Sequence, residues 1–332
     1  MKKTVSLLLA LIFILALFTS CAQNKVVEND NSAAEPVTVR LGGLKGATTI
    51  GMLHLLDSAE KGETENDYAY TLAAAADELS PLLVKGELDV IAAPVNLASV
   101  LYNNTEGKVR FAAVNTLGVL YVVEKDGESV QSVADLAGKT IYATGKGTIP
   151  EYSLRYLLTQ NGIDPDTDVT IEWKSEPTEI VALMKEDKAS VAMLPQPFVT
   201  VAQTQVENLR VALDLTEQWD MLENGSMFVT AGLIVRSAFI EEHPEEFRKF
   251  MEEYKNSTEF CKENVENIAS LCEEYDIIKA PIAQKAIPYC NITFIEGEEM
   301  AKAAEGYLRV LFEQNPASIG GAMPDEDFYY IP

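Results

Sequence analysis

Short apolar segments alternate with amphipathic segments along most of the chain. In residues 37–41 apolar and polar positions alternate, and a glycine-rich turn at 42–46 separates them from a helical pattern that reaches about Ser58. The same pattern predicts further strands at 68–73, 88–92, 109–114, 117–123, 139–143, 169–173, 190–194, 209–213 and 228–235. It predicts helices between them at 77–85, 96–102, 150–160, 178–185 and 197–205. Such alternation is typical of parallel βαβ units, so the sequence predicts an α/β fold.

The predicted elements form two similar units. Segments 86–94 and 188–195 both run from a polar turn through an apolar strand to a proline. After residue 214 the pattern changes to one strand and a long helical region that starts near His243. The simplest arrangement has a first lobe made of residues 37–124 and 226–332, with residues 125–225 inserted as a second lobe. We therefore expect two backbone crossings, near 124–130 and 212–226, to form a hinge.

The N-terminus has the features of an export signal. Met1 to Lys3 are followed by an apolar run, Leu7 to Phe18, that is too short to span a bilayer as a helix. The run ends in Leu-Phe-Thr-Ser-Cys, which resembles the lipobox of bacterial lipoproteins, in which the cysteine becomes the acylated N-terminus. Residues 1–21 are thus predicted to be a lipoprotein signal peptide with lipidation at Cys21, and residues 22–36 a flexible tether. The alternative is an ordinary secretory signal that is cut nearby.

Composition and charge restrict the function. The chain has 47% hydrophobic residues and a formal net charge of −25, which disfavours nucleic acids and anionic membrane surfaces as partners. It has two histidines, no metal-ligand spacing, no nucleophile elbow and no nucleotide-binding glycine fingerprint, so we expect no metal, no cofactor and no enzymatic activity. We also expect a monomer. Cys261 and Cys272 would lie about 16 Å apart in a continuous helix, too far for a disulfide, so they and Cys290 are predicted to be core thiols.

Candidate ligand contacts follow the predicted strands, where loops of a parallel sheet face a crevice. The strongest is the loop Gly145–Thr148, because glycines let backbone amides approach a ligand and the following helix presents unpaired N–H groups. The loop Lys45–Thr49 repeats this chemistry. Each position also has an ordinary alternative as a turn or helix cap. The predicted set is Lys45, Gly46, Thr48, Thr49, Asn96, Asn115, Thr116, Gly145, Lys146, Gly147, Thr148, Pro195 and Gln196.

Three segments carry a family resemblance. They are Gly86–Val90, Val133–Ile141 and Phe239–Glu245, in this order behind the lipobox. With them the chain resembles the substrate-binding lipoproteins of ABC importers, in the two-lobed (type II) periplasmic-binding-protein group that includes nitrate-, taurine-, alkanesulfonate- and thiamine-pyrimidine-binding proteins. The resemblance implies two lobes, each a mainly parallel sheet flanked by helices, with the ligand cleft between them. It also implies an extracytoplasmic, lipid-anchored protein whose partners are a small-molecule ligand, an ABC permease and an ATPase.

The expected function is capture of a small solute by closure of the lobes. Few aromatic residues lie near the predicted loops, which favours a small organic anion such as a sulfonate, taurine or nitrate. One alternative is a flat heterocycle of the thiamine-pyrimidine type. A second is an enzyme such as a chorismate dehydratase, because such enzymes have a similar two-lobed fold. They act on cytosolic metabolites, however, whereas residues 1–21 predict export. An exported sensor is the third alternative.

Overall fold

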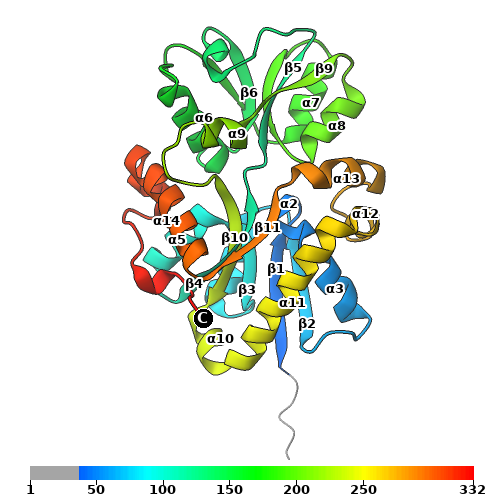
Figure 1. The fold of residues 1–332 in the computed structure, drawn as a ribbon, viewed down its shortest axis with the longest axis vertical. Helices are drawn as coiled ribbons and strands as arrows, with labels where there is room; N and C mark the ends of the chain where they lie inside the picture. Colours follow the sequence, from blue (N-terminus) through cyan, green and yellow to red (C-terminus); the bar gives the residue numbers. More distant parts are fainter. Residues whose placement is uncertain (1–36) are drawn as a thin grey trace, which may run out of the picture. The chain divides into compact units, whose positions relative to one another are not determined.

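Two mixed β-sheets organise residues 37–332, the part of the chain that this computed structural model describes (Figure 1). The predicted signal peptide, Cys21 and the tether lie outside the described residues. The first sheet has the order β11-β4-β10-β3-β1-β2. Its strands are β1 (Thr38–Leu44), β2 (Asp67–Ala73), β3 (Val90–Pro94), β4 (Val109–Leu117), β10 (Val229–Arg236) and β11 (Ile292–Glu296). The strands β2, β1 and β3 are parallel, whereas β10 is antiparallel to both β3 and β4.

The second sheet has the order β7-β6-β8-β5-β9. Its strands are β5 (Leu120–Lys125), β6 (Thr140–Thr144), β7 (Thr170–Lys174), β8 (Val191–Pro195) and β9 (Leu209–Asp214). Here β7, β6 and β8 are parallel, and β5 is antiparallel to β8 and β9. The α/β class predicted from the sequence is therefore confirmed, with antiparallel strands added to a parallel centre in both sheets.

Helices cover both faces of each sheet. With the first sheet lie α2 (Ala47–Ile50), α3 (Leu53–Glu60), α4 (Ala76–Lys85), α5 (Val95–Asn104), α10 (Ser237–Glu242), α11 (Pro244–Glu263), α12 (Val265–Glu274), α13 (Ala280–Ala286) and α14 (Gly297–Gln314). With the second lie α6 (Ile149–Gln160), α7 (Pro177–Lys185), α8 (Phe198–Gln205) and α9 (Leu215–Asp220). Short 3-10 turns are η1 (Val133–Leu136), η2 (Ile287–Tyr289), η3 (Pro316–Ile319) and η4 (Glu326–Phe328). We call each sheet with its helices a lobe.

The core follows from the apolar faces of these elements. In the first lobe, α11 places Phe247, Phe250 and Tyr254 against the β1 residues Val39 and Leu41 on one face of the sheet. The helices α4, α5 and α14 cover the opposite face, in a cluster that continues into the second lobe through β5, β6 and α6. Burial of this continuous apolar surface is the main force that stabilises the fold.

The first crossing lies earlier than the sequence analysis placed it. Strand β5 belongs to the second sheet, because Leu120 pairs with Pro195 of β8 and Tyr121 with Asp214 of β9. The chain therefore passes between the lobes at residues 117–119 and not at 124–130. The second crossing runs from the end of β9 to the start of β10 and includes α9.

The long C-terminal helical region also differs from the prediction. It breaks at Asn264, whose side-chain Nδ2 donates to the carbonyl of Phe260, so Cys261 and Cys272 lie on separate helices. Both thiols and that of Cys290 are buried in the core, as predicted, and none of the three forms a disulfide within residues 37–332. Within residues 37–332, none of the helices combines the length and the apolar character needed to cross a membrane.

Candidate functional site

Hydrogen bonds from each lobe flank the first crossing. The carbonyl of Thr48, at the start of α2, accepts a hydrogen bond from Asn115 Nδ2 on β4 at 2.9 Å. The backbone N–H of Gln196, after β8, donates to the carbonyl of Val119 at 2.9 Å. Four residues of the predicted set thus flank residues 117–119, with Thr48, Asn115 and Thr116 on the side of the first lobe and Gln196 on the side of the second. We call this region the crossing site.

Asn115 has an interior position in the crossing site. Its side chain is buried, and Nδ2 also donates to the hydroxyl of Tyr254 at 2.9 Å. Its Oδ1 accepts from the Thr116 hydroxyl at 3.0 Å. Because both ends of the amide are engaged, Asn115 holds the start of α2 against β4 and α11. Burial raises the pKa of Tyr254, so its hydroxyl stays protonated and can serve both as acceptor here and as a neutral core group.

The loop after β1 is closed by its own contacts. Thr49 Oγ1 donates to the carbonyl of Leu44 at 2.6 Å, and Thr48 Oγ1 donates to the same oxygen at 3.3 Å. The ammonium of Lys45 forms an ion pair with Asp276 at 2.8 Å and lowers the pKa of that carboxyl. Lys45 therefore already has a carboxylate partner, which reduces its capacity to attract an anionic ligand.

The loop Gly145–Thr148 is a tight strand-to-helix connection. Gly145 and Gly147 have φ values of 82° and 77°, in the left-handed region that favours glycine. The Gly147 N–H donates to Glu151 Oε2 at 2.6 Å, and Thr148 Oγ1 donates to the Gly145 carbonyl at 2.6 Å. A carboxylate of the chain itself thus occupies a donor that an anionic ligand would need. Lys146 is exposed.

The remaining predicted residues have structural roles. Asn96 Nδ2 donates to the carbonyl of Ser318 in η3, which ties α5 to the C-terminal segment. Gln196 Oε1 accepts from the Thr200 hydroxyl at 3.0 Å and so holds the start of α8. Pro195 ends β8 opposite Leu120 of β5. Of these three residues, Asn96 is bonded to a segment distant in sequence, the turn η3 of the first lobe.

A cluster of aromatic rings joins the lobes, and the sequence analysis missed it. The Trp219 ring lies 4.9 Å from that of Tyr156, 5.1 Å from Phe228 and 5.2 Å from Tyr307, between ring centroids. These rings come from α9, α6, the segment before β10, and α14. The hydroxyls of Tyr307 and Ser153 share a hydrogen bond of 2.7 Å, and both residues are fully buried. We call the four rings, together with the Ser153 that bonds to Tyr307, the aromatic seam. Its members are far apart in sequence, so no local motif announces them.

The two crossings pack directly on each other at Gly118. A Cβ atom at this position would overlap Thr216 Oγ1 and would lie 2.7 Å from the Phe228 ring. Thr216 Oγ1 is buried and has no hydrogen-bond partner among residues 37–332, and the same holds for Thr230 Oγ1 on β10. Two polar atoms that could bind a ligand therefore lie at or next to the crossings, and neither was predicted.

Among residues 37–332, no group of three or more His, Cys, Asp or Glu side chains is placed to hold a metal ion. His54 stacks on Phe260 with 3.7 Å between ring centroids, and burial lowers its pKa, which fits a structural role on α3.

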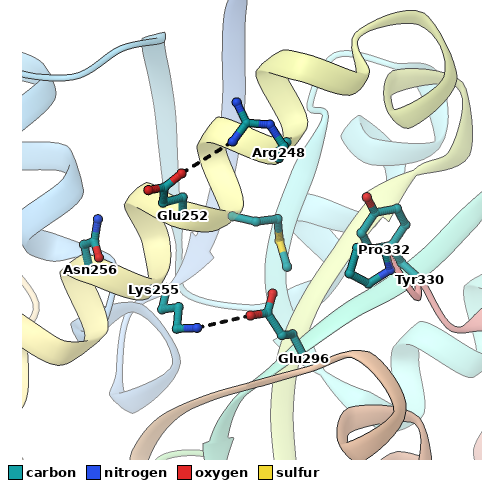
Figure 2. Close-up of a pocket in the computed structure, with 8 residues that line it drawn as sticks. Arg248, Glu252, Lys255, Asn256, Glu296, Tyr330 and Pro332 are labelled. Atoms are coloured by element: carbon teal, nitrogen blue, oxygen red, sulfur yellow. Dashed lines mark hydrogen bonds and ion pairs between the residues drawn. The ribbon is translucent and has the colours of Figure 1, made fainter.

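A separate cavity of about 410 Å³ lies along α11, and none of the predicted site residues lines it. Figure 2 shows that its charged side chains pair with each other: Lys255 with Glu296 at 3.3 Å, and Arg248 with Glu252 at 3.5 Å. Exposed pairs of this kind contribute little free energy and leave no unpaired charge for a ligand.

Comparisons with known proteins agree with the predicted resemblance. The family described as NMT1/THI5 like matches residues 109–268, from β4 into α12. A search of curated proteins found no match. The family match and the solved structures described next confirm the predicted resemblance to substrate-binding proteins of this fold.

Solved structures show the same fold. An ABC transporter structure from Parabacteroides distasonis has a TM-score of 0.74 and 24% identity, over 89% of this chain and 98% of that one. The periplasmic aliphatic sulphonate binding protein SsuA from Escherichia coli has a TM-score of 0.71 and 16% identity, over 90% and 93%. The periplasmic nitrate-binding protein NrtA from Synechocystis PCC 6803 has a TM-score of 0.57 and 14% identity, over 80% and 75%. The two-lobed periplasmic-binding-protein fold is therefore confirmed.

Proposed function

We propose that this chain is the extracytoplasmic solute-binding component of an ABC importer. The observation that carries the proposal is that two separate sheets are joined by two crossings, which pack on each other where Thr216 contacts Gly118. Two lobes joined at crossings can separate to admit a solute and close to bury it. Structures of the same fold from other organisms are described as sulphonate- and nitrate-binding proteins, which supports the same class of function here.

Contacts between the lobes supply the closing interactions. On one side, Ser153 of α6 bonds to Tyr307 of α14. On the other side, the Tyr121 hydroxyl of β5 donates to the carbonyl of Tyr289 at 2.9 Å, next to the packing of α8 on α13. A solute that contacts both lobes adds its own interaction energy to these contacts and shifts the population toward the closed state.

Two ligand classes remain, and local chemistry ranks them. A small organic anion is supported by the solved sulphonate- and nitrate-binding structures, but Lys45 is paired with Asp276, and Glu151 occupies the Gly147 amide. A flat heterocycle is supported by the aromatic seam, whose rings offer faces for stacking once the lobes part. We therefore propose a flat heterocycle first and the organic anion second.

Native mass spectrometry and thermal unfolding test both proposals. Freshly purified protein is expected to carry a small molecule whose mass identifies it. In a thermal-shift panel of pyrimidines, sulfonates, taurine and nitrate, a true ligand at a hundred times its Kd adds about 2.7 kcal/mol of stability. A shift with anions alone reverses the order of the two classes. No bound molecule and no shift contradict solute capture, and turnover of chorismate would replace it with catalysis.

A further inference from the structure

A second cavity lies beside the first crossing, and its walls touch the residues that hold that crossing. It has a volume of about 320 Å³ and is bounded by α11, the start of α12, η2 and β11. Figure 1 shows α11, α12 and β11 near one another in the first lobe. Ligand pockets typically measure about 300 to 1,000 Å³, so this cavity is large enough for a small molecule. We call it the α11–α12 cavity.

The floor of the α11–α12 cavity is apolar. Cys261, Ile287 and Ile292 form it, with exposed fractions of 0%, 5% and 8%. Burial raises the pKa of the Cys261 thiol to about 12, so the thiol is neutral at pH 7 and behaves as an apolar group. The floor therefore favours a hydrocarbon or aryl group.

The rim of the cavity is positively charged. Lys262 is the charged side chain among the lining residues, which include no carboxylate, although the chain has 51 acidic residues. Lys262 forms no ion pair within residues 37–332, unlike Lys45 and Lys255. An apolar floor with one unpaired ammonium at its edge is complementary to a small monoanion with an apolar body.

Two wall residues connect the cavity to the first crossing. Asn291 Nδ2 donates to the Gly118 carbonyl at 2.5 Å, and the Asn291 carbonyl accepts from the Leu117 N–H at 3.1 Å. Ile292, the next residue, pairs with Thr116 on β4. A molecule in the cavity thus contacts the side chains that fix residues 116–118, where the chain passes between the lobes.

We propose that the α11–α12 cavity is a second ligand site, which takes a small monoanion with an apolar body and stabilises the first crossing through Asn291. Such an occupant changes how easily the lobes open and close. The solute and the occupant then change each other's affinity for the protein by the same factor. Binding to the cavity is independent of the proposed function, whereas the effect on solute capture rests on it.

Calorimetric titration of the mature protein with octanoate tests the binding, with octylammonium and 1-octanol as probes of matched length. Octanoate is expected to bind more tightly than either. Lys262→Gln weakens octanoate roughly two- to fivefold, as expected for loss of an exposed charge pair, whereas Lys302→Gln on α14 has no effect. Val265→Trp at the rim, or Cys261→Met in the floor, fills the cavity and abolishes binding. Absence of octanoate binding, a tighter octylammonium complex, or unchanged binding to a folded cavity-filled variant overturns the site.

Hydrogen exchange tests the coupling without any solute. Octanoate is expected to slow exchange of the Leu117 amide, which donates to Asn291. Asn291→Gly keeps the backbone at its φ of 45° and removes the side-chain donor to Gly118. Because Asn291 also lines the cavity, the two proteins are compared at octanoate concentrations that saturate each of them, and the Leu117 amide of the variant is then expected to gain no protection. Equal protection in both proteins contradicts the role of Asn291, and neither result depends on whether the solute panel succeeds.

Discussion

Single residues decide how closely the two crossings can approach. Gly118 has an ordinary φ, so its requirement for glycine comes from space and not from backbone conformation. Thr216 and Phe228 occupy the volume that a side chain at this position would need. The sequence shows a glycine between two apolar strands, but the residues that contact it come from a segment about a hundred positions later. Its close-packed role was therefore not predictable from local pattern.

Replacing Gly118 with alanine is expected to destabilise the fold by about 1–3 kcal/mol, because the new methyl group overpacks a filled site. Urea unfolding monitored by circular dichroism measures the change. The double variant Gly118→Ala/Thr216→Ala removes one of the two opposing groups, so part of the lost stability should return. An alanine variant as stable as the parent would mean that the crossings are not in contact in solution.

The lowered pKa of the Asp89 carboxyl leads us to expect a specific pH dependence of stability. Burial raises the pKa of this carboxyl, but hydrogen bonds from Arg40 at 2.8 and 2.6 Å and from Arg236 at 2.8 Å outweigh that effect, so the pKa lies below its ordinary value. A carboxyl whose pKa is lowered by folding contributes stability above its unfolded pKa of about 3.9, and loses it as the pH falls through the folded pKa.

Asp89→Asn is therefore expected to lower the free energy of unfolding at pH 7 by about 3–5 kcal/mol, because it leaves two arginines near a buried site without their carboxylate. Below about pH 4 the difference between variant and parent should shrink. Urea unfolding at a series of pH values from 7 to 3 measures both effects. A difference that stays constant with pH would show that the carboxylate charge is not the stabilising feature.

At the scale of elements, the positions of strands and helices could be predicted from the sequence far better than which strands pair and which helices pack together. Alternation and helical periodicity are local signals, so nearly every predicted range coincides with an element of the structure. Sheet membership is not local: β5 continues the apolar pattern of β4 after one glycine, yet pairs with β8 and β9. The aromatic seam was missed for the same reason, since four elements distant in sequence build it.

The contact of α6 with α14 predicts the effect of Tyr307→Phe. Removal of the hydroxyl leaves that of Ser153 buried without its partner, which costs about 1–3 kcal/mol. Since these residues lie on different lobes, the loss should favour opening. Trp219 fluorescence in a Trp173→Phe background should then shift to the red, and the radius of gyration from small-angle X-ray scattering should rise.

The matched control for this contact is Ser153→Ala/Tyr307→Phe. It removes both hydroxyls, so no buried polar group is left unpaired, and most of the lost stability and the original fluorescence should return. A double variant as open and unstable as Tyr307→Phe would assign the effect to ring packing and not to the hydrogen bond.

At the scale of the whole molecule, the net charge of −25 describes the solvent-facing surface, and the crossing site must be considered locally. Surface carboxylates farther than about 8 Å are largely screened at physiological salt. Close contacts therefore dominate what a ligand experiences. At the loops after β1 and β6, Asp276 pairs with Lys45 and Glu151 with the Gly147 N–H. At the α11–α12 cavity, by contrast, the charged lining side chain is Lys262, which forms no ion pair within residues 37–332.

The acidic surface also bears on the predicted lipid anchor. A chain of this charge gains nothing from anionic lipid headgroups, so the predicted attachment to a membrane depends on the acyl chain expected at Cys21. Cys21→Ser should move the protein from the membrane fraction to the soluble extracytoplasmic fraction, whereas Cys261→Ser, which changes a buried core thiol, should leave it with the membrane. Fractionation and intact mass measure both. A Cys21→Ser protein that stays with the membrane, or a parent protein without acyl mass, would contradict the lipid anchor and leave an ordinary secretory signal as the explanation of residues 1–21.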